Sequence, residues 1–179
     1  KLVSGCLLSS PGNSVGLSLM PDSMSGNDIT FSGEIIQYDI GYARAEESWN
    51  CIMAGIHVMM FGQGELGGLT INLANTNFTI SGALSVSNCL VAGVMFGIPL
   101  DSRSARVITP NDIYDMRVND VNIAIEPSAV LAGRTASGIF FFLSQIQNSF
   151  WNGLTMSMSG HLSGVSAYGV YFYDFELGT

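Results

Sequence analysis

The sequence contains few charged residues, and very few basic ones. Charged residues make up 11% of the 179-residue chain, Lys1 is the only lysine, and six basic residues face fourteen acidic ones. Binding to nucleic acid phosphates or to an anionic membrane surface depends on clustered lysine and arginine. We therefore expect neither nucleic acid nor an anionic membrane surface as a partner.

Long apolar runs are also absent. The longest run covers residues 89–100 and contains Gly93, Gly97 and Pro99. A helix that crosses a bilayer needs about 20 predominantly apolar residues. The sequence therefore predicts no membrane span.

Residue patterns typical of enzymes are missing. His57 and His161 are the only histidines, and the metal-binding spacings CxxC and HExxH do not occur. Glycoside hydrolysis requires two carboxylates that face each other across a cleft, and nothing distinguishes a pair such as Asp120 and Glu126 from ordinary surface acids. We expect no catalytic residue, no metal, no cofactor and no enzymatic activity.

Apolar residues, in contrast, are abundant. They make up 47% of the chain, a proportion that excludes disorder, because disordered chains combine low hydrophobicity with high charge. The length is sufficient for one domain with its own core, so we predict a single domain over residues 1–179. Such a low content of charged residues is typical of a protein whose surface is largely covered by other subunits in an assembly.

An internal repeat is the most informative feature of the sequence. Residues 50–56 (NCIMAGI) recur at 88–94 (NCLVAGV), and related units contain Gly16, Gly138 and Gly169. Successive anchor glycines are 39, 38, 45 and 31 residues apart. Repeats of this length indicate a protein built from stacked units.

Each anchor glycine is followed by alternating apolar positions. Alternation with a period of two predicts a β-strand with one buried face. The glycine itself suits a positive φ or a close backbone neighbour. The predicted inward residues are Leu17, Ile56, Val94, Ile139 and Val170, followed two positions later by Leu19, Val58, Phe96, Phe141 and Phe172.

A second alternating segment follows in most units. These segments cover residues 29–33, 78–82, 121–125 and 154–158, and several end in Ser-Gly, which is a turn signal. Helical periodicity is nearly absent, and we predict at most one short helix within residues 39–49.

These patterns predict an all-β protein, a short parallel β-helix of about five coils. A β-sandwich or jelly roll is the alternative, because it could use the same strands in antiparallel pairs. The recurrence of similar residues at equivalent positions favours the β-helix. Only stacked coils bring equivalent positions into contact, about 4.8 Å apart.

Residues 138–144, 148–156 and 167–173 resemble the NosD-type right-handed parallel β-helix repeat. The resemblance extends over 138–175 and, more weakly, over 50–96. That repeat occurs in microbial and archaeal cell-surface proteins, periplasmic carbohydrate-binding proteins and phage tailspikes. The resemblance implies a β-solenoid fold, and it carries no functional residue to this chain.

Cys51 and Cys89 occupy the same position in two consecutive repeats. Stacked coils would place their Cα atoms within the range for a disulfide. A Cys51–Cys89 bridge and a ladder of two buried thiols are both open interpretations. Cys6 is the third cysteine, left for an intermolecular bond or for no bond.

The positions between the inward residues form a second apolar stripe. If its residues face outward, they are candidates for an interface with another subunit or an aromatic platform for sugars. Two alternatives are that a loop of the same chain covers the stripe, or that inside and outside are reversed. The stripe contains His57, Met59, Met95, Phe140, Phe142, Tyr171 and Tyr173.

Together these observations predict a non-enzymatic, extracellular structural protein. We expect a self-assembling β-solenoid subunit of a sheath, surface layer or filament, located at a cell or virion surface, with copies of itself as partners. No polar cap protects either end, and the strand over residues 168–175 is an edge that could pair with another chain. The alternative is a receptor-binding or carbohydrate-binding module of the tailspike or adhesin type, with cell-surface glycan as its partner.

Overall fold

The computed structural model describes residues 2–3, 14–19, 23–37, 52–59, 69–87, 89–97, 114–142 and 150–173. Within these ranges the chain forms fifteen strands and no helix. The short helix predicted within residues 39–49 lies outside the described residues.

The strands form three sheets in which every pair is parallel. Sheet B contains all five glycine-anchored strands, and sheet A contains the four predicted second segments. Sheet C consists of short strands that the alternation did not reveal. Sheet B comprises β2 (Ser14–Leu19), β6 (Ile52–Met59), β9 (Leu90–Gly97), β12 (Thr135–Phe142) and β15 (Ser166–Tyr173). Sheet A comprises β1 (Leu2–Val3), β3 (Ser23–Ser25), β4 (Asp28–Phe31), β7 (Leu69–Ile80), β10 (Tyr114–Ile125) and β13 (Phe150–Met158). Sheet C comprises β5 (Glu34–Gln37), β8 (Ala83–Val86), β11 (Val130–Ala132) and β14 (His161–Ser163).

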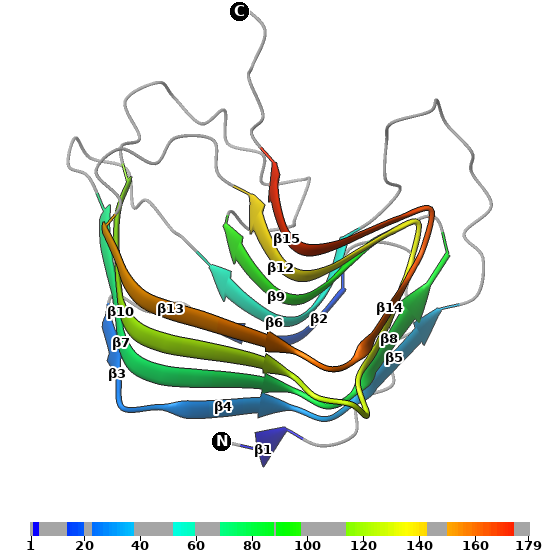
Figure 1. Ribbon diagram of the computed structural model, residues 1–179, viewed down its shortest axis with the longest axis horizontal. Helices are drawn as coiled ribbons and strands as arrows, with labels where there is room; N and C mark the ends of the chain where they lie inside the picture. The colour runs from blue at the N-terminus through cyan, green and yellow to red at the C-terminus, as the bar shows by residue number, and fades with distance from the viewer. Residues whose placement is uncertain are drawn as a thin grey trace, which may run out of the picture.

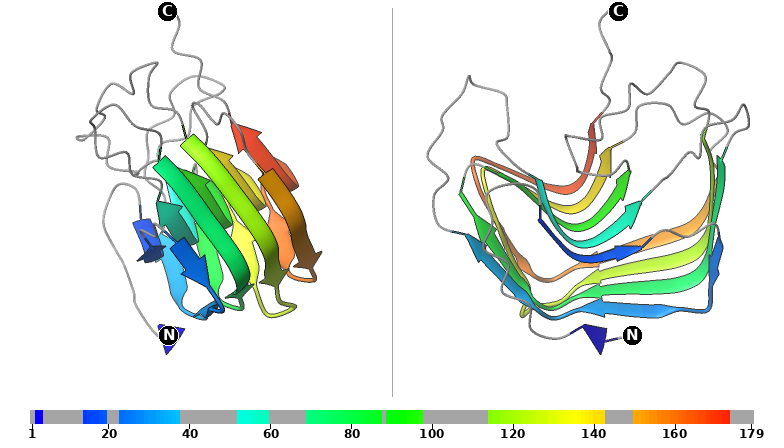
Figure 2. Two further views of the ribbon diagram at one scale, coloured as in Figure 1. Left: turned by 90° about the vertical axis from the view of Figure 1, so that its left-hand side faces the viewer. Right: turned by 180° about the vertical axis from the view of Figure 1, so that it is seen from behind.

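From β2 onward the chain visits the sheets in the fixed order B, A, C, and each coil adds its strands beside those of the previous coil (Figure 1). This is a parallel β-helix, with strands stacked side by side along its axis (Figure 2). The fold prediction is therefore confirmed, and the antiparallel sandwich is wrong. About four coils are present rather than five, because β15 is not followed by a strand of sheet A or sheet C in the described part of the chain.

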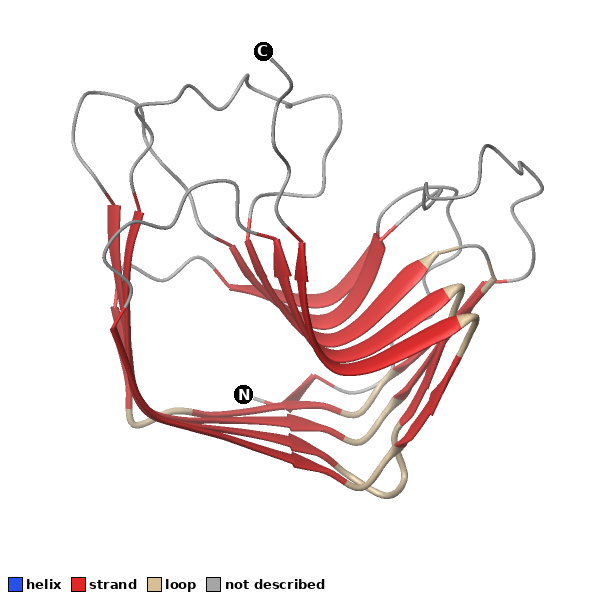
Figure 3. Ribbon diagram, turned by 45° about the horizontal axis from the view of Figure 1, so that its top comes forward, coloured by secondary structure: helices blue, strands red, loops and turns tan. Residues whose placement is uncertain are grey.

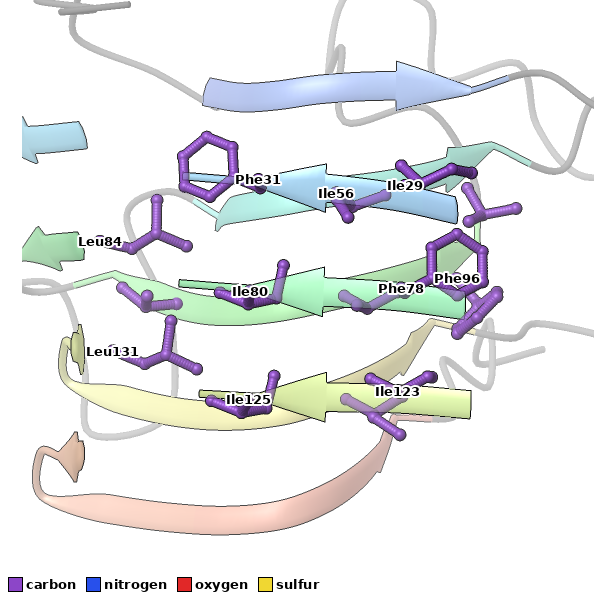
Figure 4. Close-up of a cluster of buried hydrophobic side chains, with 14 of the residues drawn as sticks. Ile29, Phe31, Ile56, Phe78, Ile80, Leu84, Phe96, Ile123, Ile125 and Leu131 are labelled. Carbon is purple, nitrogen blue, oxygen red and sulfur yellow. The ribbon is translucent and has the colours of Figure 1, made fainter. Parts of the chain in front are cut away.

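The three sheets enclose one apolar interior (Figure 3). Equivalent residues of successive coils stack in columns, as Phe31, Ile80 and Ile125 do in Figure 4. All three side chains are at most 2% exposed. The predicted inward residues Ile56, Val58, Val94, Phe96, Ile139 and Phe141 all belong to this interior cluster.

The anchor glycines form a column in sheet B where space is short. A Cβ on Gly93 would lie 2.8 Å from the backbone oxygen of Gly138, and a Cβ on Gly55 would lie 3.0 Å from that of Gly93. The Gly93 Cβ would also approach the Ile125 side chain of sheet A to 2.8 Å. The repeat therefore uses glycine for close approach, one of the two reasons that the sequence left open.

A second column marks a corner in the middle of sheet A, where the long strands bend (Figure 1). The strand registers place Asn75, Asp120 and Gly153 at equivalent positions, and Gly26 occupies this corner in the first coil. Their φ angles are 47°, 50°, 74° and 68°, all in the left-handed region. Glycine, asparagine and aspartate are the residues that adopt this conformation most readily, so local chemistry explains each choice.

Candidate interaction surface

The interior contains a stack of aromatic rings that runs toward the C-terminal end of the β-helix. The rings of Phe96 and Phe141 stack at a centroid distance of 5.1 Å and an angle of 13°. Phe141 and Phe172 continue the stack at 4.7 Å and 8°. The stack follows the strand register, which pairs Phe96 with Phe141 and Phe141 with Phe172.

This stack ends on an open face. Phe141 is 1% exposed, whereas Phe172, at the same position one coil later, is 64% exposed. Val170 is 40% exposed, although its counterpart Ile139 is completely buried. The apolar residues of the last coil in sheets A and C are only partly buried as well, namely Leu154, Met156, Met158 and Leu162.

The strands at this end also have one unpaired side. Among the described strands, β13, β14 and β15 each pair only with the preceding coil. At the opposite end β1 covers β4, and the inward residues Ile29 and Phe31 are 7% and 2% exposed, although β2 and β5 also have one unpaired side among the described strands. The end face formed by β13, β14 and β15 therefore combines exposed interior residues with open strand edges, the features through which β-strands recruit further strands.

The predicted outer stripe lies on the other face of sheet B from the interior. Met95 and Phe140 belong to a separate apolar cluster, so the assignment of inside and outside was correct. His57, Met95 and Phe140 are nevertheless at most 1% exposed, and Tyr171 is partly buried. These three side chains do not form an open surface, because they are already shielded within a single chain. Met59, Phe142 and Tyr173 fall on strand residues whose side chains are not described, and the role of the stripe as an interface stays a prediction.

One part of the stripe continues to the surface near β15. The ring of Tyr171 stacks on Phe140 at 5.6 Å and on Tyr168 at 4.7 Å, with an angle of 11° between the two tyrosine rings. Tyr168 is 41% exposed. The two tyrosines thus form a small aromatic pair next to the open end of the coil.

Cys89 directly precedes β9 and is fully buried. Its sulfur is disulfide-bonded. The two other cysteines, Cys6 and Cys51, lie outside the described residues. Register favours Cys51, because Ile52 pairs with Leu90 and the two cysteines directly precede these residues in sequence. The Cys51–Cys89 pairing stays a prediction.

A polar ladder on the outer face of sheet A was not anticipated. Asn122 donates a hydrogen bond from Nδ2 to Asn77 Oδ1 at 3.0 Å, and Asn77 donates from Nδ2 to Asp28 Oδ1 at 2.6 Å. The three side chains are exposed and occupy equivalent positions in three coils. An alignment of the four segments that begin at the corner column would have revealed it, because each has a polar residue two positions after the corner.

Within the described residues, no three His, Cys, Asp or Glu side chains are grouped so that they could hold a metal ion. Asp120, in β10, and Glu126, directly after it, are both exposed. The described part of the chain has no helix with the length and hydrophobicity of a membrane span. The expectations on catalysis, cofactors and nucleic acid stay predictions.

Comparison with known proteins gave no family model, no curated protein and no solved structure that matches this chain. The parallel β-helix architecture agrees with the resemblance to the NosD-type repeat, while membership of that family is not supported.

Proposed function

We propose that this protein is a non-enzymatic extracellular structural protein, a β-solenoid subunit that assembles with copies of itself into a sheath, surface layer or filament. The exposed C-terminal end face carries this proposal. Phe172 is 64% exposed there, although the two earlier phenylalanines of its column are 1% exposed. Exposed interior residues beside unpaired strand edges form a surface that a further coil would complete.

The other surfaces of the described part of the chain are less suited to association. The stripe residues His57, Met95 and Phe140 are buried in the single chain, and thus need no partner to shield them. The outer face of sheet A is polar, with its asparagine ladder exposed. Among the described residues, the end face is therefore the surface where association would remove the largest apolar groups from water.

The proposal is tested by electron microscopy and sedimentation velocity of the purified chain over a range of concentrations, without ligand. We expect the wild type to form elongated assemblies, and Phe172→Asp to remain monomeric because the charge would be buried at the junction. Asn75→Asp is the matched control, because Asn75 is exposed in an internal coil away from the end face, and an aspartate, Asp120, already stands at the equivalent position one coil later. A wild type that stays monomeric at every concentration would contradict the proposal.

A carbohydrate-binding module is the second candidate. The stacked pair Tyr168 and Tyr171 favours it, since Tyr168 is 41% exposed and flat aromatic faces pack against sugar rings. A glycan array separates the two candidates. Glycan binding by a monomer that is lost in Tyr168→Ala would support the binding module, and assembly without glycan supports the structural role.

A further inference from the structure

The two ends of the β-helix are complementary in strand order. The chain passes through the sheets in the order B, A, C, and its last described strand, β15, belongs to sheet B. The next strand in this order would belong to sheet A. The first described strand, β1, belongs to sheet A and pairs with β4 at the opposite end (Figure 1).

From this relation, and resting on the proposed function, we infer that a second copy of the chain adds head to tail. Its β1 pairs with β13, and its β2 pairs with β15, both in parallel and in the register of the internal coils. The same contact repeats at the free end of the added copy, because the interface joins two different surfaces. A contact of this kind generates an open filament rather than a closed dimer.

The register defines which residues meet at the junction. Leu17 and Leu19 of β2 pair with Ile56 and Val58 of β6, in the column that continues to Val170 and Phe172 of β15. A β2 strand placed on β15 in the same register therefore brings Leu17 onto Val170 and Leu19 onto Phe172. Val170 and Phe172 are 40% and 64% exposed in the single chain, so this contact would cover both.

Sheet A supports the same arrangement. Leu2 and Val3 pair with Thr30 and Phe31, whose column ends at Ser157 and Met158 in β13. When β1 of the added copy occupies the edge of β13, Leu2 comes beside Ser157, and Val3 covers Met158, which is only partly buried in the single chain.

The glycine column provides a specific test of this in-register pairing between β2 of the added copy and β15. In each internal coil, a Cβ on the anchor glycine would meet the backbone oxygen of the next one, at 3.0 Å for Gly55, 2.8 Å for Gly93 and 2.9 Å for Gly138. Gly169 ends the column, and its nearest neighbour would be the flexible Met156 Cε at 3.2 Å. Gly169→Ala is therefore tolerated by the single chain, whereas it would clash with the Gly16 oxygen of an added copy.

The first experiment compares wild type, Gly169→Ala and Phe172→Asp by sedimentation velocity and electron microscopy, with thermal unfolding as a control for the fold. We expect Gly169→Ala to unfold at the wild-type temperature and to assemble at least tenfold more weakly. Assembly of Gly169→Ala at wild-type strength, with Phe172→Asp still monomeric, would overturn the in-register seating and leave the proposed function intact. A monomeric wild type would overturn both.

A second experiment identifies which ends meet. Adjacent strands lie about 4.8 Å apart, within the Cα separation for a disulfide. Ser157→Cys and Leu2→Cys, each in a Cys6→Ser background, are oxidised separately and as a mixture. Head-to-tail addition predicts a crosslink in the mixture between the two different variants. A crosslink formed by Ser157→Cys alone would show that two C-terminal ends meet and would overturn the inference.

Discussion

Phe141 and Phe172 occupy the same position in consecutive coils, and their rings stack at 4.7 Å and 8°, yet one is buried and the other is 64% exposed. The difference arises because, among the described strands, Phe141 has a coil on each side, whereas Phe172 has a coil on one side only. A phenylalanine at this position of the repeat thus belongs to the core in one coil and to the end face in the next.

Truncation of these two rings should have very different effects on stability. We expect Phe141→Ala to lower the free energy of unfolding by about 3–5 kcal/mol, because it leaves a cavity in a closed core. Phe172→Ala should cost only about 1 kcal/mol, the value of one stacking contact on an exposed surface. Chemical denaturation under conditions that keep the chain monomeric measures both values, and equal losses would contradict an open end.

The glycine column predicts that the loss of stability caused by an alanine substitution depends strongly on which glycine of the column is replaced. Gly93→Ala should destabilise the chain by about 1–3 kcal/mol, since the new methyl group would overlap the Gly138 oxygen and the Ile125 side chain. Gly169→Ala in the monomer is the control, and it should leave the unfolding midpoint within experimental error. A mild Gly93→Ala effect would show that the coils separate more easily than the close contacts indicate.

The corner of sheet A can be tested at Asn75, which is exposed and has a φ of 47°. Asn75→Ala should lower stability by about 1 kcal/mol because a β-carbon disfavours the left-handed conformation. Asn75→Gly should be neutral or slightly stabilising, since glycine adopts this conformation without strain. Thermal unfolding of the two variants checks the prediction, and equal behaviour would indicate that the corner imposes no conformational demand.

The polar ladder predicts a charge effect. Asn77→Asp would replace the donor to Asp28 by a second carboxylate, and repulsion between the two should lower stability by a few tenths to about 1 kcal/mol. The site is exposed, so the loss should shrink in about 1 M salt. Asn77→Ser, which removes the amide without adding charge, is the control. A salt-independent loss would show that repulsion is not the cause.

The cysteine prediction is tested by peptide mapping without reductant. We expect a crosslinked peptide that contains Cys51 and Cys89. Cys51→Ser should lower stability by roughly 3–4 kcal/mol, because the bridge would close a long loop in the unfolded chain. Cys6→Ser should have no effect. A Cys6–Cys89 peptide would identify the other pairing.

The amino-acid sequence by itself determined the repeat and the direction of its side chains. The alternation after Gly55, Gly93 and Gly138 identified the strands of sheet B and the residues that face the interior. This was possible because a β-strand directs successive side chains to opposite faces, so a period of two appears directly in the sequence. The recurrence of similar residues at equivalent positions then indicated stacked parallel coils, since no other arrangement brings those positions together.

Only the tertiary structure decided which apolar residues are exposed. His57 and Phe140 have the outward positions that the sequence predicted, yet both are buried, whereas Phe172 has an inward position and is largely exposed. Alternation reports the face of a strand on which a side chain lies, but exposure depends on what packs against that face and on whether another coil follows. The ladder from Asp28 to Asn122 likewise required the register between strands, because its members are far apart in the chain and meet only when the coils stack.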